Sequence, residues 1–317
     1  ANPQVLQAFS RALGREAHVL TQHPDLLWQQ MYNHLQWAKG AVENQLVEVR
    51  KQRSMPGTVP WAQTRTRFWE SEGLLHTLPG HANPVSGCAI SPDGHWVISS
   101  SFDGTLKVWE PFSGRELRTL VGHTNSVWGC ALSPDGRWVI STSDDKHAPD
   151  DKSAMMVYGT LKVWETATGR VLHTLTGHTR LVTGCAISPD GCWMISSSYD
   201  KTLKIWELSS GRELRTLEGH TDWVKGCAIS PDGAWVVSAS KDMTLKMWEA
   251  STGRELRSLV GHTGPVLGCA VSPDGKWVIS ASADKTLIVW DAATGQDLRT
   301  LAGHTDEVEG CAVSPDA

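Results

Sequence analysis

The stretch "GHTDWVKGCAISPDG", residues 219–233, places a histidine, a cysteine and two aspartates within fifteen positions. That mixture is compatible with a metal site, or with a nucleophile and its base. The Gly-His pair that opens it occurs six times, however, at 80–81, 122–123, 177–178, 219–220, 261–262 and 303–304, with spacings of 42, 55, 42, 42 and 42 residues. A period near forty residues is typical of a repeat architecture. Because a catalytic centre needs one special place, a motif present in every copy indicates a scaffold.

Each copy is predicted to form four short strands. In the copy quoted above, apolar or alternating runs cover 224–230, 234–240, 244–248 and 255–259, and turn residues cover 231–233, 241–243 and 251–253. Proline and glycine favour such turns because they set or permit the required φ angles. The 42 residues leave no room for a helix. One four-stranded sheet cannot bury both faces alone, so we expect neighbouring copies to stack on one another.

Four strands per copy, a Gly-His near the start and a Trp-Asp or Trp-Glu near the end resemble the WD-repeat β-propeller family. The resemblance covers residues 73–317, and the second letter departs from it in four copies, which read Trp-Glu, whereas Trp290-Asp291 keeps the usual pair. The near-identity of the copies is common in bacterial members. The resemblance implies an all-β propeller of four-stranded antiparallel blades, five complete and one partial, after an α-helical segment over 1–72. The expected blades lie near 79–120, 121–175, 176–217, 218–259 and 260–301, with a partial one over 302–317.

The resemblance also implies a hydrogen-bonded tetrad of histidine, serine, aspartate and tryptophan within each blade. The matching residues are His81, Ser99, Asp103 and Trp109; His123, Ser141, Asp145 and Trp164; His178, Ser196, Asp200 and Trp206; His220, Ser238, Asp242 and Trp248; and His262, Ser280, Asp284 and Trp290. A hydrolase is the alternative interpretation of Ser, His and Asp together. It is disfavoured because the set recurs in five blades and the chain lacks a G-x-S-x-G elbow. We therefore predict no catalytic residue and no cofactor.

The cysteines follow the repeat as well. Six of the seven occupy one position of the copy, where they are expected to be small core residues, and no C-x-x-C occurs, so no metal site is predicted. Cys192 is the seventh, at a turn position where an exposed free thiol fits a reducing, cytoplasmic location. The net charge of −5 without a long basic run argues weakly against nucleic-acid binding. The sequence contains no apolar stretch of 18 residues, so we predict no membrane span.

Residues 1–53 lack the repeat and show helical spacing of apolar residues, with a helix start at Asn2-Pro3. The segment "LGREAHVLTQHPDLLWQQMYNHL" (13–35), with the Pro-Trp connector after it, resembles the helical linker of STAND (NB-ARC-like) signalling NTPases that carry a propeller. An ordinary helical cap is the alternative. The chain has no G-x-x-x-x-G-K-[ST] loop, so it cannot itself bind ATP in that manner.

The two ends of the repeat region raise the question of how a propeller would close. "GLLHTL" (73–78) matches the fourth strand of the other copies, and we expect it to complete the last blade. The sixth copy reaches only "SPDA" (314–317), one strand and its turn. Exposed sheet edges are a liability. We expect the chain to be a fragment of a propeller with six or seven blades.

Binding residues are expected where the repeat varies, on the face formed by the loops before the first strand and between the second and third strands. The candidates for partner binding are Phe102, Trp128, Asp144, His147, Tyr199, Trp223, Lys225 and Lys241. Aromatic residues beside lysine are typical of binding hot spots, and neutral drift at exposed sites is the rival interpretation. Thirteen extra residues within 144–159 belong to the same face and are predicted to be a recognition loop. A Ca²⁺ site from Asp144, Asp145, Asp150 and Asp151 is the alternative, although the order does not match an EF-hand.

These observations favour a non-catalytic interaction or sensor module that recognises a protein or ligand and is part of a larger signalling NTPase. A free-standing scaffold of a multiprotein complex is the first alternative, and an enzyme built on a propeller is the second. A phosphate-binding loop in a longer reading frame would distinguish the first two. The enzyme would need one singular cluster of acidic or histidine side chains.

Overall fold

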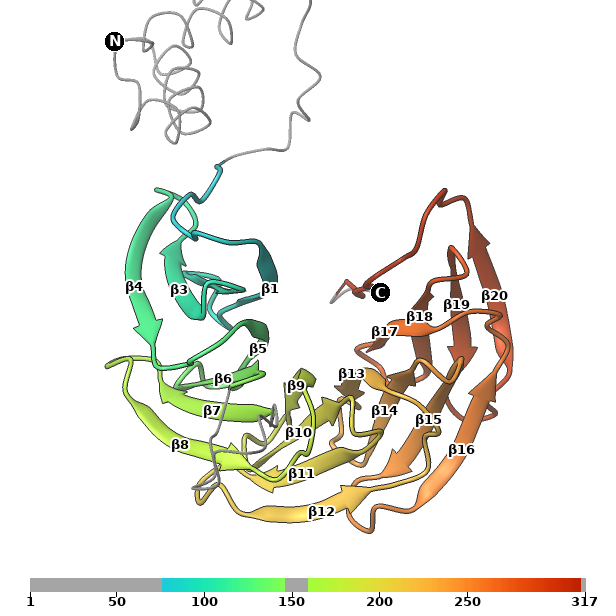
Figure 1. The fold of residues 1–317 in the computed structure, drawn as a ribbon. Helices are drawn as coiled ribbons and strands as arrows, with labels where there is room; N and C mark the ends of the chain where they lie inside the picture. The colour runs from blue at the N-terminus through green and yellow to red at the C-terminus, as the bar shows by residue number, and fades with distance from the viewer. Residues whose placement is uncertain (1–75, 146–158, 315–317) are drawn as a thin grey trace, which may run out of the picture. The chain divides into compact units, whose positions relative to one another are not determined.

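A computed structural model describes residues 76–145 and 159–314. These residues form twenty β-strands and no helix (Figure 1). The helical segment predicted over 1–72 and thirteen residues of the insertion, 146–158, lie outside the described residues. By their contacts the chain divides into two units, Ala1–Gly80 with Trp109–Leu117, and His81–Val108 with Arg118–Ala317. Apart from Trp109, the site residues described below belong to the second unit.

Each of the first five copies of the repeat folds into one four-stranded antiparallel sheet, with its strands in chain order. The first sheet contains β1 (Val85–Ile90), β2 (Val97–Ser101), β3 (Thr105–Glu110) and β4 (Arg115–Val121). The second contains β5 (Val127–Leu132), β6 (Trp138–Ser143), β7 (Thr160–Glu165) and β8 (Val171–Thr176). The third contains β9 (Val182–Ile187), β10 (Trp193–Ser198), β11 (Leu203–Glu207) and β12 (Glu213–Leu217). The fourth contains β13 (Val224–Ile229), β14 (Trp235–Ser240), β15 (Thr244–Glu249) and β16 (Glu255–Val260), and the fifth contains β17 (Val266–Val271), β18 (Trp277–Ser282), β19 (Thr286–Asp291) and β20 (Asp297–Ala302). The predicted all-β fold of four-stranded antiparallel blades is confirmed.

The turn after each first strand is closed by a serine and an aspartate of the Ser-Pro-Asp-Gly motif. In the fourth sheet, Ser230 Oγ donates to Asp232 Oδ1 at 2.6 Å, and the Trp235 amide donates to Ser230 Oγ at 3.0 Å. Gly233 has a φ of 70°, a left-handed conformation that glycine adopts without the steric cost of a Cβ. The motif therefore fixes where β13 ends and β14 begins.

The hydrophobic core lies between neighbouring sheets, which explains why the strands carry apolar residues on both faces. One cluster joins Ile195 and Leu203 of the third sheet to Val224, Val236 and Trp248 of the fourth. Trp248 is only 1% exposed. Burying side chains of this size stabilises each sheet-to-sheet contact by roughly 1.5–3 kcal/mol per residue. No sheet is therefore stable without a neighbour on its face.

The first strands of neighbouring sheets lie side by side, and the fourth strand lies at the far edge of each sheet (Figure 1). The glycine of each Gly-Cys-Ala motif lies at this contact. A Cβ at Gly184 would lie 3.5 Å from the Gly226 Cα, and a Cβ at Gly226 would lie 3.7 Å from the Gly268 Cα. These are ordinary van der Waals distances, so the first strands pack against one another at these glycines.

Two expectations about the ends of the repeat region are wrong for the described residues. His76–Gly80 form no strand, although 73–78 was predicted to complete the last blade; residues 73–75 lie outside the described part. Residues 303–314 of the sixth copy also form no strand, but the Val308 amide donates to Ser282 O at 3.0 Å, so the segment lies against the fifth sheet. A fourth strand needs a third strand as its hydrogen-bonding partner, and the described part of the sixth copy supplies none.

Candidate functional site

One histidine in each sheet connects three other polar side chains. In the fourth sheet, His220 Nδ1 lies 2.7 Å from Asp242 Oδ2, and His220 Nε2 lies 2.8 Å from Ser238 Oγ. The Trp248 indole donates its Nε1–H to Ser238 Oγ at 2.9 Å. The histidine lies before β13, the serine on β14, the aspartate in the turn after it and the tryptophan on β15. The tetrad therefore ties all three strands together.

The other sheets repeat this geometry. The histidine-to-aspartate distances are 2.7 Å for His123–Asp145, His178–Asp200 and His262–Asp284, and 2.9 Å for His81–Asp103. The histidine-to-serine distances are 2.6 Å for Ser141, 2.8 Å for Ser196, 2.7 Å for Ser280 and 2.8 Å for Ser99. The indoles of Trp164, Trp206 and Trp290 donate to the tetrad serine at 2.7, 2.9 and 2.8 Å. Trp109, its counterpart in the first sheet, is buried.

A threonine two positions after the aspartate is a further member that the sequence analysis missed. Thr244 Oγ1 donates to Asp242 Oδ1 at 2.7 Å, and the Thr221 amide donates to Asp242 Oδ2 at 3.0 Å. Burial alone would raise the pKa of Asp242, but the hydrogen bonds from His220 and Thr244 outweigh it and hold the pKa well below its usual range. The corresponding donors of the fifth sheet, Thr286 and His262, outweigh burial in the same way and lower the pKa of Asp284 to about 2. The recurring Asp-x-Thr motif was the sequence pattern that could have predicted this contact.

These contacts leave the tetrads little capacity for chemistry on a substrate. Both ring nitrogens of His220 are engaged, and the side chain of His220 is fully buried. The Ser238 hydroxyl is held between the imidazole and the indole. A nucleophile needs an open approach to the reacting atom. The tetrads are therefore structural elements of each sheet.

The residues predicted to bind a partner form two aromatic pairs, each of which joins two sheets. Phe102, which follows β2, packs against Trp128 on β5 with ring centroids 4.7 Å apart at 54°. Tyr199, which follows β10, stacks on Trp223, which precedes β13, with centroids 4.2 Å apart at 8°. The two tryptophans that the repeat does not require thus each contact an aromatic residue of the preceding sheet.

Two lysines complete the second pair. Lys225 Nζ on β13 donates to the Tyr199 hydroxyl at 2.6 Å and lies over the Tyr199 ring, 4.5 Å from its centroid. Lys241 Nζ lies 4.4 Å from the centroid of the Trp223 ring, a cation–π contact. We call Tyr199, Trp223, Lys225 and Lys241 the cationic–aromatic cluster. Asp222 Oδ2 lies 4.0 Å from Lys241 Nζ at its border.

Other positions of the same face have a different role. Ser86 Oγ donates to Val127 O at 2.6 Å, and Thr183 Oγ1 donates to Val224 O at 2.8 Å, so both link one sheet to the next. Asp144 is half-buried after β6, and His147 lies outside the described residues. Residues 150 and 151 of the alternative Ca²⁺ site also lie outside, and Asp145 belongs to a tetrad. Within 76–145 and 159–314, no three acidic, histidine or cysteine side chains group as metal ligands do.

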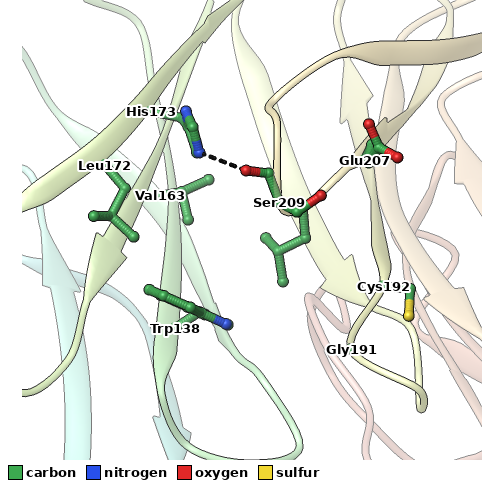
Figure 2. A pocket seen from close by; sticks show the side chains of 9 residues that line it. Trp138, Val163, Leu172, His173, Gly191, Cys192, Glu207 and Ser209 are labelled. Atoms are coloured by element: carbon green, nitrogen blue, oxygen red, sulfur yellow. Dashed lines mark hydrogen bonds between the residues drawn. The ribbon is translucent and has the colours of Figure 1, made fainter.

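A pocket of about 320 Å³ between the second and third sheets is a second place where the repeat varies (Figure 2). Trp138 and His173 line it from one sheet and Cys192 and Ser209 from the other. His173 Nε2 bonds Ser209 O at 3.1 Å. All four other sheets carry arginine at this position, and Arg118 and Arg257 donate to carbonyl groups of the next sheet, those of Thr166 and Ala293. The shorter imidazole leaves the pocket open.

The cysteines depart in part from their expected role. Cys192 is exposed, as predicted, and all seven thiols are free. Cys88 is also exposed, and the remaining five are half-buried. Burial raises the pKa of the Cys130 and Cys227 thiols to about 12. The described residues contain no helix that could cross a membrane.

Comparison with known proteins gives a family match over more than half of the chain. The family described as "WD domain, G-beta repeat" matches residues 72–110, 114–148, 169–207, 211–249 and 253–291. These five segments correspond to the five sheets, although each match begins with the fourth-strand region of the preceding copy. The sequence repeat and the sheet are thus offset by one strand.

Individual relatives match shorter regions. The chain is 38% identical over 165 residues to "Periodic tryptophan protein 2 homolog" of Mus musculus, a match that covers 42% of this chain and 18% of that protein. It is 48% identical over 40 residues to "Target of rapamycin complex subunit wat1" of Schizosaccharomyces pombe, covering 13% of each chain. It is 28% identical over 124 residues to "Apoptotic protease-activating factor 1" of Rattus norvegicus, covering 39% of this chain and 9% of that protein. The chain therefore spans less than a fifth of the length of these relatives.

Proposed function

The chain belongs to the WD-repeat family, and we propose that it is a non-catalytic module that recognises a protein partner through the face that carries Phe102, Trp128, Tyr199 and Trp223. Proteins of this family are generally scaffolds. The observation that carries the proposal is that each non-repeat tryptophan pairs with an aromatic residue of the preceding sheet. Rigid aromatic groups at a surface contribute much of the free energy of binding at protein interfaces.

The tetrads support a non-catalytic role, because their polar atoms satisfy one another within the sheet. Among relatives, the yeast protein is by its name a subunit of a complex, which agrees with a role in assembly. A propeller enzyme would require a singular cluster of reactive side chains. The pocket at Cys192 and His173 is the place in the described part of the chain where such a cluster would have to be sought.

The larger setting that we propose is a signalling NTPase in which this module is the sensor. The support is the resemblance of residues 13–35 to the helical linker of such proteins, together with the match to a protease-activating factor. A free-standing scaffold of a complex is the alternative. An ATP-binding assay on the product of the complete reading frame distinguishes them, since only the NTPase binds the nucleotide. The free thiols, Cys192 exposed among them, support a reducing compartment such as the cytoplasm.

A capture experiment tests the proposed function. The chain is immobilised, a lysate of its source organism is passed over it, and the retained proteins are compared with those on a Trp128→Ala/Trp223→Ala variant. The variant is expected to lose the retained partner while it keeps the wild-type circular dichroism spectrum. A Leu214→Ala/Leu256→Ala variant is the matched control, because it removes two exposed apolar side chains from β12 and β16. Equal capture by the two variants contradicts the proposal.

The insertion offers a second arm of this test. Gly159 donates its amide to Arg180 O at 3.0 Å, and Thr160 Oγ1 donates to Asp145 Oδ2 at 2.7 Å, so the end of the insertion is joined to described residues of two sheets. Deletion of 147–156 keeps the residues that make both contacts. The shortened chain is expected to fold and to bind the partner more weakly. Unchanged binding would remove the insertion from the proposed recognition surface.

A further inference from the structure

The cationic–aromatic cluster is a place of concentrated positive charge within the described repeats. The second position of the first strand is occupied by Ser86, Trp128, Thr183, Lys225 and Leu267 in the five sheets, and the position before the tetrad aspartate by Phe102, Asp144, Tyr199, Lys241 and Ala283. At these two positions, only the fourth sheet carries positively charged residues, Lys225 and Lys241. They lie beside the stacked Tyr199–Trp223 pair. The chain as a whole has a net charge of −5, so the cluster is locally opposite to its background.

The hydrogen bonds of the cluster leave donors in excess. Lys225 donates to the Tyr199 oxygen at 2.6 Å, so the phenolic O–H remains able to donate to another group. Among the described residues, no acceptor group forms a hydrogen bond with that O–H, and no carboxylate lies within 4.0 Å of Lys225 Nζ. An ammonium group has three N–H donors and no acceptor. A ligand atom that accepts from both Lys225 and Tyr199 would satisfy the site.

Lys241, the second cation of the cluster, also favours an anionic ligand. Lys241 lies over the Trp223 ring, and its nearest described carboxylate, Asp222, is 4.0 Å away with both side chains about 40% exposed. A pair of that kind contributes little, because solvent screens it. The charge of Lys241 therefore remains available to a second anionic group. The ring stack, tilted by only 8°, holds both lysines in position.

We propose that the cationic–aromatic cluster binds the carboxylates of an acidic peptide segment of a protein partner. This inference rests on the proposed function, whose partner it describes more closely. One carboxylate accepts from Lys225 and Tyr199, and a second approaches Lys241. An apolar side chain between them packs against the half-buried ring stack. Phosphate shares the acceptor chemistry, but the planar fork of arginine favours bidentate binding of phosphate, and the cluster contains no arginine.

The probe is a fluorescein-labelled peptide, Gly-Glu-Leu-Glu-Phe-Glu-Gly, titrated with the full chain and followed by fluorescence anisotropy at low salt. The counterpart in which glutamine replaces each glutamate has the same shape without charge. We expect the acidic peptide to bind and the neutral one to bind at least about tenfold more weakly, since a hydrogen bond to a charged group contributes about that factor. Lys225→Met should raise the Kd about tenfold, and Lys241→Met, at the partly solvent-exposed lysine, about two- to fivefold.

Two further variants keep the test specific. Tyr199→Phe removes the phenolic donor while it preserves the stack, and it should weaken binding several-fold. Lys276→Met is the matched control, because it removes an exposed lysine that pairs with Asp274 in the turn between β17 and β18. It should leave the Kd unchanged. A loss of binding in the Lys276 variant equal to that in the Lys225 variant would show general charge attraction and overturn the assignment.

Other outcomes distinguish a carboxylate ligand from phosphate, and distinguish this inference from the proposed function. Displacement of the peptide by an equimolar concentration of inorganic phosphate, or equal binding of the neutral peptide, overturns the carboxylate assignment. Capture of a partner that needs Trp128 and Trp223 but neither lysine leaves the proposed function intact and refutes this inference. Peptide binding that depends on both lysines, without capture of any partner, supports the site and refutes the proposed function.

Discussion

At the residue scale, the chemistry of four side chains fixes the proton positions in each tetrad. The Asp242 carboxylate can only accept, so His220 carries its proton on Nδ1 and donates it to Asp242. His220 Nε2 then accepts from the Ser238 hydroxyl, whose oxygen in turn accepts from the Trp248 indole. The order of donors has one direction, from indole to carboxylate. A change at one member therefore affects all four.

The carboxylate of the tetrad should give the fold a defined sensitivity to acid. The pKa of Asp242 lies below its ordinary value of 3.8 in the folded protein, so its stabilisation is present above that value and is lost as the pH falls toward the folded pKa. Asp242→Asn should lower the free energy of unfolding at pH 7 by about 1–3 kcal/mol, because the imidazole loses a charged acceptor. The variant should also lose less stability than the wild type between pH 5 and pH 3.

Urea unfolding at several pH values measures both effects. Asp297→Asn is the control, because Asp297 is an exposed residue of β20 outside any tetrad. Its unfolding curves should follow those of the wild type at every pH. A pH dependence in Asp242→Asn as steep as in the wild type would show that the tetrad carboxylate does not contribute to acid unfolding.

The tetrad turn also contains a strained backbone position. Met243 has a φ of 68°, and Lys201 and Lys285 have similar values, whereas the first sheet places Gly104 at the same position with a φ of 82°. The left-handed region costs a side-chain-bearing residue about 1–2 kcal/mol, and glycine loses part of that gain through backbone entropy. Met243→Gly should therefore stabilise the chain by up to about 1 kcal/mol in urea unfolding, since Met243 is 46% exposed and buries little. Gly104→Ala is the converse variant, and a stabilising effect there would contradict this account.

At the scale of the strand and the sheet, the sequence predicted what depends on one copy alone. The runs proposed at 224–230, 234–240, 244–248 and 255–259 correspond to β13, β14, β15 and β16, because alternation and turn residues are local signals. The contact of Lys225 with Tyr199 could not be predicted, since it depends on how closely one sheet lies to the next. The links from Ser86 and Thr183 to the following sheet were missed for the same reason. The strand predicted at 73–78 is absent over the described residues 76–78, because pairing needs a partner strand that the motif itself does not reveal.

The pocket between the second and third sheets should close when the repeat is restored. His173→Arg introduces the side chain that donates to the next sheet at Arg118 and Arg257. The arginine should bond Ser209 O, fill part of the 320 Å³ pocket and stabilise the chain by about 0.5–1.5 kcal/mol, or roughly 1–5 °C in Tm. Arg215→His in the third sheet is the matched converse and should lower Tm. A lower Tm for His173→Arg would mean that the neighbouring Trp138 and Leu172 do not accommodate the longer chain.

At the scale of the whole described assembly, stability comes from contacts between successive sheets. The first strands follow one another through the glycines of the Gly-Cys-Ala motifs, and the apolar clusters each combine residues of adjacent sheets. In repeat structures of this kind, free energy is approximately a sum of nearest-neighbour terms. One cysteine beside each glycine reports on the packing at that place. The thiols of Cys130, Cys185, Cys227 and Cys269 therefore monitor the opening of sheet contacts along the chain.

Thiol reactivity in the native protein should fall into two main classes. Cys88 and Cys192 are exposed and should react with Ellman's reagent at pH 8 before any unfolding, Cys192 more slowly than a free thiol because the Asp190 carboxylate raises its pKa. Cys130, Cys185, Cys227 and Cys269 should react only when the sheets separate, since burial raises their pKa and each packs against an apolar cluster between neighbouring sheets. Cys192→Ser should remove one early equivalent and leave the slow class unchanged. If the slow thiols react one after another as the urea concentration rises, sheet contacts open individually. A single step of reaction shows that the contacts open together. Reaction of all seven thiols before unfolding would contradict the packing described.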